Sequence, residues 1–271
     1  MNLKDFEEQE QQNILTHTVS NEMAASGLKV LSYAFKEISL ESFNSLMNSK
    51  HVESEEFRQE IESELIYIAT FGLEDPLRDD IGTAVQMIRF GHKQTSSDTI
   101  ESYQVNIRMI TGDHIETARE VAFRTGIINE EEKFEDGVVI SSQKFREMMG
   151  EVSQIYDPIS GDNRIEFLEG RKRFDEMKKK VKVIARCTSE DKFIFVCGIK
   201  QKGGLVGMTG DSISDAEALK KADVGFCMGS GCDVAKDNSD LVILDNDFVS
   251  IHRSIRWGRA IFDNVRKFLQ F

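Results

Sequence analysis

Apolar residues in the first third of the chain recur in blocks that predict two strands and two helical stretches. The segment LKVLSYAF is β-branched and aromatic, so we expect a buried strand there. A second apolar run, in ELIYIATFGLEDPLR, predicts another strand, which stops at Gly72 and Pro76. Apolar positions at helical spacing cover 41–64 and 80–90, whereas 91–103 is polar and predicts a surface loop.

From VNIRMI onward a pattern of strand, turn and helix repeats. VNIRMI leads into a TGD turn at 111–113 and a helix over 114–125, VKVIARC leads into another helix, and LVGMTGD brings a second TGD turn at 209–211 before a third. Repeated units of this kind predict a parallel sheet flanked by helices. Ligands bind at the carboxyl ends of such strands, which is where both TGD turns fall, and we expect the two strands to be neighbours. A short strand, VILD, and a helix from Val249 follow; the helix is still running at the last residue, so we expect the chain to be incomplete.

Composition narrows the partners that the chain can have. It has 271 residues, of which 40% are hydrophobic and 30% charged, which is typical of a globular protein with a sizeable core. The formal net charge of −13 would repel a polyphosphate backbone, so we expect no nucleic acid partner. The four cysteines show no C-x-x-C pair and predict reduced, packed thiols. No apolar run approaches the roughly 18 residues of a membrane helix.

The turns carry residue types suited to phosphate and metal. Thr111 and Gly112 precede a helix N-terminus that can hold phosphate, and Lys192 would add a compact positive charge. Asp211 and Asp215 offer the hard oxygen ligands that Mg²⁺ accepts.

Each of these residues also has a structural explanation that the sequence leaves open. Asp113 and Asp211 stand where N-cap residues stand, because an aspartate before a helix accepts its first free N–H groups. Lys192 by itself would be a solvated surface lysine. The occurrence of two TGD turns in one chain favours a functional role.

Taken together, several segments resemble the phosphorylation domain of P-type ATPases, which are members of the haloacid dehalogenase superfamily, and the plasma-membrane-type calcium pumps above all. The segments are GLEDPLR, MITGDHIETA, VIARCTSEDK, MTGDSISDAEALKKADVGF, MGSGCDVAKDNSDLVILDNDF and WGRAIFDNVRKFLQF. The resemblance implies an α/β fold, a Rossmann-like haloacid dehalogenase-type parallel sheet flanked by helices, preceded by a partial α+β nucleotide-binding domain. It implies three parts: the end of the nucleotide-binding domain at 1–66, the phosphorylation domain at 67–256, and the start of a stalk or membrane helix at 257–271.

The resemblance also implies roles for single residues. Catalytic roles fall to Thr111, Lys192, Asp211 and Asp215, and the two aspartates would be ligands of Mg²⁺. Nucleotide or phosphate contacts are expected from a larger set, namely Lys29, Thr111, Gly112, Asp113, Arg186, Lys192 and Ser214. Lys29 stands where the family usually has an arginine, so it keeps the charge and loses the bidentate fork.

Two departures from the family pattern affect what to expect. The pattern GDGxNDxP appears as GDSISDAE, so Ser212, Ser214 and Glu217 replace a glycine, an asparagine and a proline, and weaker turnover is expected. No DKTGT sequence, which would carry the phosphorylated aspartate, occurs in the 271 residues. In the related fold that strand lies between the strands that carry the two TGD turns, so we expect either a marginally stable chain or direct pairing of those two strands.

The sequence therefore predicts the cytosolic ATP-hydrolysing part of a membrane-bound cation pump for Ca²⁺, with ATP and Mg²⁺ as cofactors and with an actuator domain and membrane helices as partners. The isolated chain would be inactive. Two alternatives stay open at this point: a non-catalytic regulator that binds nucleotide or Mg²⁺, and a soluble phosphatase of the same superfamily.

Overall fold

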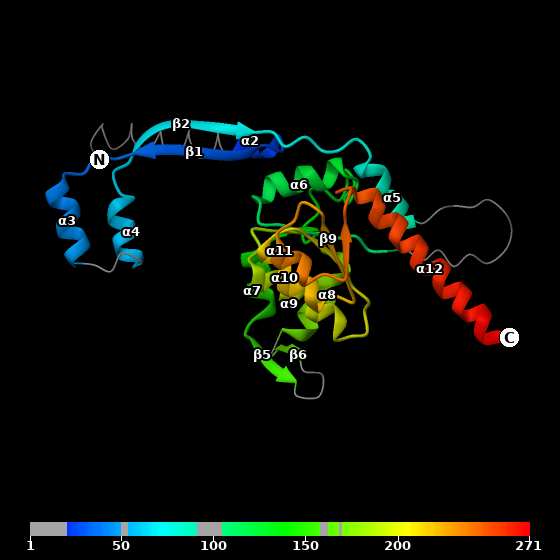
Figure 1. Ribbon diagram of the computed structural model, residues 1–271. Helices are drawn as coiled ribbons and strands as arrows, with labels where there is room; N and C mark the ends of the chain where they lie inside the picture. The colour runs from blue at the N-terminus through cyan, green and yellow to red at the C-terminus, as the bar shows by residue number, and fades with distance from the viewer. Residues whose placement is uncertain (1–20, 50–53, 91–104, 158–161, 168–169) are drawn as a thin grey trace. The chain divides into compact units, whose positions relative to one another are not determined.

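A computed structural model describes residues 21–49, 54–90, 105–157, 162–167 and 170–271. The chain divides into two units, Met1–Asp75 and Pro76–Phe271 (Figure 1). The strand at 66–73 pairs within the first unit, whereas the sequence-based division starts its second domain at 67. The functional identity of the three predicted domains stays a prediction, and the loop predicted at 91–103 lies outside the described residues.

The smaller unit is built on a two-stranded antiparallel ribbon. Strand β1 pairs with β2 from Lys29↔Leu73 to Phe35↔Ile66, with an irregularity after Tyr33. Its described elements are α2 (Asn21–Ala25), β1 (Lys29–Phe35), α3 (Leu40–Ser49), α4 (Glu55–Ile61) and β2 (Ile66–Leu73).

The prediction that the first strand is buried is wrong. Tyr33 and Phe71 meet edge to face at 5.8 Å across the ribbon, yet each is 54% exposed. Among the described residues of this unit no second layer covers either face of the ribbon, and a two-stranded ribbon alone cannot bury its side chains. The apolar pattern correctly indicated a strand, because a pleated backbone with β-branched and aromatic side chains favours that conformation.

The larger unit alternates strands and helices. Its described elements are α5 (Ile81–Phe90), β3 (Met109–Ile110), α6 (Ile115–Arg124), β4 (Val139–Ser141), α7 (Ser142–Met149), β5 (Val152–Asp157), β6 (Asp162–Phe167), α8 (Arg171–Lys180), β7 (Val183–Ala185), α9 (Ser189–Lys200), β8 (Gly207–Gly210), a 3₁₀ turn (Ile213–Asp215), α10 (Ala216–Lys221), β9 (Val224–Met228), α11 (Asp233–Asp237), β10 (Leu241–Ile243) and α12 (Phe248–Gln270). The predicted succession of strand, turn and helix is confirmed, although the first strand is shorter than VNIRMI.

The strands form two parallel three-stranded sheets, in the orders β3-β7-β4 and β10-β9-β8, and a separate antiparallel hairpin of β5 and β6. Register runs through Met109↔Val183 in the first sheet and Gly207↔Val224 in the second. The predicted α/β class with parallel sheets flanked by helices is confirmed. The strands that precede the two TGD turns are not neighbours, however: β3 and β8 lie at the edges of different sheets. They do not pair with each other, so the predicted option of direct pairing across the gap is wrong.

The main core lies where α7, α8 and α9 pack together. Phe195 of α9 meets Phe174 of α8 at 5.9 Å and Phe145 of α7 at 6.1 Å, both edge to face. Helix α9 is buried from Asp191 to Gly198, which explains why its apolar residues show no single stripe. This packing fixes the helix that carries Lys192.

A second apolar cluster joins α5 to the start of α12. Ile251 is buried with Ile88, Phe226 and Ile243, whereas the outer part of α12 is exposed, with Trp257 at 71%. Within the described residues no helix has both the length and the apolar character needed to cross a bilayer.

We predict that amide hydrogen exchange will alternate along β3. Met109 and Thr111 donate their N–H groups to Lys182 and Ile184 of the β7 segment at 2.9 Å, so the N–H of Ile110 points to the other edge of β3, where no described strand pairs. Exchange measured by NMR should be slow at Met109 and Thr111 and fast at Ile110, with the central strand β7 as the protected control. Strong protection throughout 108–110 and 205–208 would contradict open edges.

Candidate functional site

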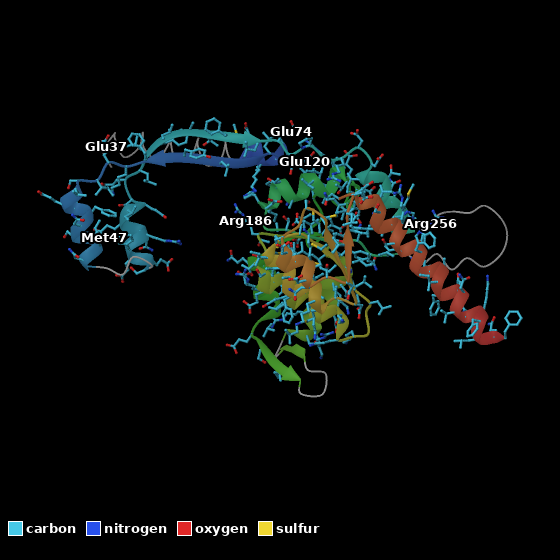
Figure 2. The ribbon with its side chains drawn as sticks, viewed as in Figure 1. Glu37, Met47, Glu74, Glu120, Arg186 and Arg256 are labelled. Atoms are coloured by element: carbon cyan, nitrogen blue, oxygen red, sulfur yellow. The ribbon has the colours of Figure 1, made fainter. Side chains whose placement is uncertain are left out.

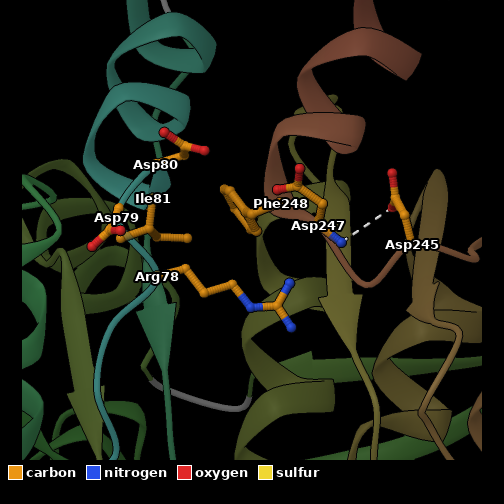
Figure 3. A pocket seen from close by; sticks show the side chains of 7 residues that line it. All are labelled: Arg78, Asp79, Asp80, Ile81, Asp245, Asp247 and Phe248. Carbon is orange, nitrogen blue, oxygen red and sulfur yellow. Dashed lines mark hydrogen bonds between the residues drawn. The ribbon is translucent and has the colours of Figure 1, made fainter.

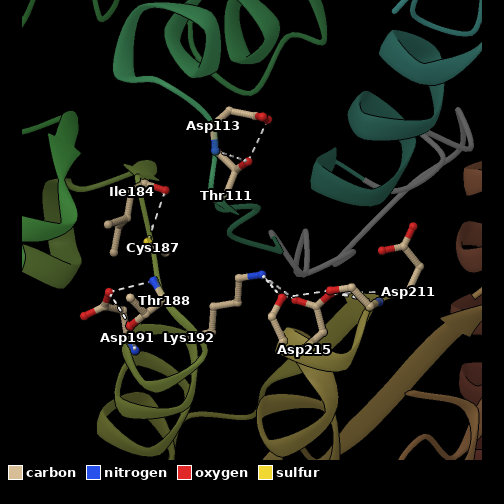
Figure 4. A network of polar contacts seen from close by, with 11 residues as sticks. Thr111, Asp113, Ile184, Cys187, Thr188, Asp191, Lys192, Asp211 and Asp215 are labelled. Atoms are coloured by element: carbon tan, nitrogen blue, oxygen red, sulfur yellow. Dashed lines mark hydrogen bonds and ion pairs between the residues drawn. The ribbon is translucent and has the colours of Figure 1, made fainter. Parts of the chain in front are cut away.

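The first TGD turn ends β3 and is held by hydrogen bonds of its own. The Thr111 hydroxyl donates to Asp113 Oδ2 at 2.8 Å and accepts from the Asp113 N–H at 3.1 Å (Figure 4). Gly112 and Asp113 are exposed. Helix α6 begins after this turn, but its N-cap is His114, whose Nδ1 accepts from the Glu116 N–H. The N-cap explanation of Asp113 is therefore wrong.

The second TGD turn is organised by Asp215, which is buried. Its Oδ2 accepts from the Ser212 hydroxyl at 2.7 Å, from the Ser212 N–H at 3.2 Å and from the Asp211 N–H at 3.3 Å. Ser212 has an extended backbone with φ −110°, and it caps the 3₁₀ turn. No left-handed conformation is needed at this position, so serine in place of the family glycine is accommodated without backbone strain. The cap is Ser212, so Asp211 is not an N-cap either.

Gly210 is required by the close approach of Asp215. A Cβ atom at Gly210 would lie 2.5 Å from Asp215 Cβ and 2.8 Å from its Cγ. At Gly112, in the first turn, the nearest atom to such a Cβ is the Cys187 carbonyl oxygen at 3.8 Å. The two glycines of the repeated motif therefore differ: one is needed for packing and the other is not.

Lys192 links the two sheets. It extends from the first turn of α9, which follows β7, and its Nζ donates to Asp215 Oδ1 at 2.7 Å and to Ser214 Oγ at 3.1 Å (Figure 4). Lys192 and Asp215 are 8% and 7% exposed, so this is a buried ion pair. Burial raises the pKa of Asp215, but the hydrogen bonds from Lys192 and Ser212 outweigh it and hold the pKa below its ordinary value. The explanation of Lys192 as a solvated lysine is wrong.

The two aspartates predicted as metal ligands differ in availability. Both carboxylate oxygens of Asp215 are engaged, by Lys192 and by Ser212. The carboxylate of Asp211 is exposed and directed away from that pair (Figure 4), and no hydrogen bond to it is found among the described residues. A hard carboxylate of this kind fits a Mg²⁺ ligand that leaves several positions to water and phosphate oxygens, whereas Asp215 fits an internal anchor. Within the described residues no group of three acidic, histidine or cysteine side chains forms a metal cluster.

Arg186 lies at the surface at the end of β7 (Figure 2) and connects to the first turn through its backbone. Its N–H donates to the Asp113 carbonyl at 3.0 Å, and its own carbonyl accepts from Ser142 Oγ at 2.6 Å. Its φ of +59° lies in the left-handed region, which a side chain with a Cβ rarely adopts. Lys29 is exposed at the start of β1 in the other unit, and its nucleotide contact stays a prediction.

Sequence reasoning missed a second buried carboxylate, beside Lys192. Asp191 is 2% exposed and forms a reciprocal capping box with Thr188 at the start of α9. Arg146 of α7 donates to both its oxygens, from Nε at 2.7 Å and from Nη2 at 2.6 Å. In the sequence, the T-x-x-D spacing before an apolar run could have indicated this capping box. The partner Arg146 lies 45 residues away in sequence and left no signal.

Cys187, which follows β7 near this site, is partly buried. Burial raises the pKa of Cys187 to about 12, so almost no thiolate forms at neutral pH. All four cysteines are free, and two of them, Cys197 and Cys227, are buried.

A hollow of about 300 Å³ lies elsewhere, between the starts of α5 and α12 (Figure 3). It is lined by Arg78, Asp79, Asp80, Ile81, Asp245, Asp247 and Phe248. Asp247 caps α12 by accepting from the Val249 N–H at 2.9 Å, and Asp245 accepts from Ser250 Oγ at 2.6 Å. These two carboxylates therefore serve to stabilise the start of α12. No predicted site residue lines the hollow.

Comparison with known proteins shows what the chain is similar to. Residues 2–80 match the family described as P-type ATPase, cytoplasmic domain N. A solved catalytic domain of the CPx-ATPase CopB-B aligns with a TM-score of 0.42 and 18% identity, over 72% of this chain and 51% of that one. The chain is related to the P-type ATPases, as its motifs predicted.

The similarity extends to calcium-transporting members over most of the chain. A putative plasma membrane-type calcium-transporting ATPase 13 of Arabidopsis thaliana is 32% identical over 98% of this chain and 21% of its own length. Plasma membrane calcium-transporting ATPase 1 of Gallus gallus is 32% identical over 95% and 19%, and calcium-transporting ATPase 2 of Schizosaccharomyces pombe is 36% identical over 77% and 13%. The chain thus spans about a fifth or less of the curated relatives it matches.

We predict that alanine is tolerated at Gly112 and not at Gly210. Gly210→Ala should lower the free energy of unfolding by about 1–3 kcal/mol, because its Cβ would displace Asp215. Gly112→Ala, the matched control in the other turn, should change it by less than about 1 kcal/mol. Urea denaturation followed by circular dichroism measures both; equal losses would show that the close approach at Gly210 is not required.

Stability should also depend on pH through the two buried carboxylates. Burial raises the pKa of Asp191 too, but its hydrogen bonds from Arg146 and Thr188 hold that pKa below the ordinary value, as at Asp215. A depressed pKa in the folded chain stabilises it above the unfolded pKa of about 3.9, and this stabilisation is lost as the pH falls through the folded value. Urea denaturation between about pH 6 and pH 3 should show the free energy of unfolding falling below about pH 4. Asp191→Asn should make the free energy of unfolding depend less on pH. A wild-type free energy of unfolding that stays constant down to pH 3 would contradict the prediction.

Proposed function

We propose that the chain is part of the cytosolic ATP-hydrolysing portion of a calcium-transporting P-type ATPase, which binds the phosphoryl group and Mg²⁺ during the reaction. The observation that carries the proposal is the buried contact of Lys192 with Asp215 and Ser214, beside an available Asp211 carboxylate. The 32% sequence identity with calcium-transporting ATPases over nearly the whole chain supports its assignment to this class of pump. Ca²⁺ as the ion, the membrane location, and the actuator domain and membrane helices as partners rest on that similarity.

Each site residue has a distinct proposed task. Lys192 neutralises phosphate charge, and Asp215 holds the Lys192 ammonium in place. Gly112 offers a backbone N–H to phosphate oxygens, and the Thr111 hydroxyl, which donates to Asp113 here, would turn its hydrogen to a bound phosphate. Asp211 would hold Mg²⁺, which when bound neutralises charge on the phosphate oxygens.

Nucleotide contacts are proposed for a further group of residues. Arg186 and Asp113 are joined through the backbone and face solvent, where a nucleotide can reach them. Ser214 would share phosphate contact with Lys192, and Lys29 is proposed as a further nucleotide contact. In the intact pump an aspartyl phosphate would form on a residue outside these 271, which hold no DKTGT.

The isolated chain is therefore expected to bind without turnover. The binding-only alternative, a regulator, has the replacements at Ser214 and Glu217 in its favour. Ca²⁺-dependent ATP hydrolysis by a longer protein that contains this chain and has the length of its relatives would exclude the regulator.

The test is binding of ATP and of inorganic phosphate by the isolated chain, with and without MgCl₂, measured by calorimetry and ³¹P NMR. Asp211→Asn should remove the Mg²⁺ dependence, and Lys192→Ala should raise the phosphate dissociation constant by about tenfold or more, since a hydrogen bond to a charged group is worth roughly 1.5–3 kcal/mol. Glu130→Gln, an exposed substitution beyond the far end of α6, is the control and should change neither. Binding that is indifferent to Mg²⁺, to Asp211→Asn and to Lys192→Ala would overturn the proposal.

A further inference from the structure

Helix α7 contacts the candidate site without contributing a predicted site residue. Ser142 and Arg146 lie one turn apart, so they share one side of the helix. Ser142 reaches the carbonyl of Arg186, and Arg146 reaches Asp191. Both contacts lead to segments that carry a positive side chain of the site.

The contact of Arg146 is specific in geometry. Its guanidinium donates two parallel hydrogen bonds to Asp191, at 2.7 Å and 2.6 Å, which is the bidentate pairing that arginine makes and lysine cannot. Asp191 Oδ2 also accepts from the Thr188 N–H at 2.8 Å and from the Thr188 hydroxyl at 2.9 Å. Arg146 therefore holds the first turn of α9 in place from a neighbouring helix.

Lys192 is the next residue along that turn. Its ammonium has to span from α9 to Asp215 on the other side of the boundary between the two sheets, and it arrives at 2.7 Å. The four-carbon stem can absorb small shifts of the helix end, but a larger shift moves the ammonium out of hydrogen-bond range. The position of Lys192 thus depends on the capping box, and the box is tied to α7 by Arg146.

We propose that Arg146 is a positioning residue for Lys192: through its bidentate contact with Asp191 it sets the first turn of α9, and hence the reach of Lys192 to Asp215 and to a bound phosphate. The part that concerns phosphate rests on the proposed function. The part that concerns Lys192 and Asp215 rests on the contacts alone.

The chain offers a matched control at the other end of α9. Arg171 of α8 holds the other end of α9, donating from Nη2 to the Gly198 carbonyl at 3.1 Å and from Nη1 to Gln201 Oε1 at 2.8 Å. Arg171→Ala removes an arginine that stabilises α9 at the end away from Lys192. Arg146→Ala removes one at the end next to it.

The first measurement is the rate at which an acetylating reagent modifies Lys192 in the full chain, followed by peptide mass spectrometry. Lys192 is 8% exposed and paired, so it should react slowly in the wild type. In Arg146→Ala its rate should rise about fivefold or more relative to exposed lysines, as its hydrogen bonds are lost. In Arg171→Ala the rate should stay at the wild-type value. Arg146→Lys, which keeps the charge and one contact, should give an intermediate rate and serves if the alanine variant does not fold.

The second measurement is the dissociation constant of inorganic phosphate with MgCl₂, taken well below the melting temperature of each variant. It should rise about tenfold in Arg146→Ala and stay unchanged in Arg171→Ala, even where both variants lose similar stability.

The two measurements separate the two proposals. If Lys192 is modified no faster in Arg146→Ala or Arg146→Lys than in the wild type, Arg146 is not a positioning residue. If the rate rises but the wild type binds no phosphate, the positioning of Lys192 stands and the proposed function fails.

Discussion

The buried ion pair between Lys192 and Asp215 is the interaction on which the arrangement of the larger unit depends. The ammonium comes from the helix after β7, and the carboxylate comes from the turn after β8, so one contact joins two separate parallel sheets. Removing either charge from water is costly, and the cost is offset only when every remaining hydrogen-bonding position is filled. Asp215 meets that condition, since its second oxygen accepts from Ser212 and from the backbone.

The same requirement explains the residues around the pair. Position 210 requires glycine because Asp215 lies too close to leave room for a Cβ atom. Ser212 supplies the hydroxyl that donates to the second oxygen of the Asp215 carboxylate. On the other side of the contact, the capping box at the start of α9 fixes the backbone from which Lys192 extends. Asp211 stays out of this network and keeps its carboxylate available, so two aspartates four residues apart take different roles.

Local sequence patterns could predict a good part of this structure. The change from strand period to helix period, with glycine and proline at the ends, predicted the α/β class and placed most elements. The two TGD turns indicated where polar groups would gather. The prediction of a buried first strand was wrong because residue type favours strand conformation without saying whether a second layer covers it. The expectation that β3 and β8 are adjacent strands was wrong because strand pairing depends on contacts between residues far apart in the sequence.

The sequence by itself determined the elements, their order, the parallel character of the sheets and the candidate residues Thr111, Asp211, Asp215 and Lys192, because these follow from short-range periodicity and from motif spacing. Only the tertiary structure decided which carboxylate is engaged and which is available, and that Arg146 reaches Asp191 across 45 residues. The physical reason is that burial and ion pairing are properties of the space between elements: the same aspartate is a cap, an anchor or a free ligand according to which side chains the fold brings within about 3 Å of it.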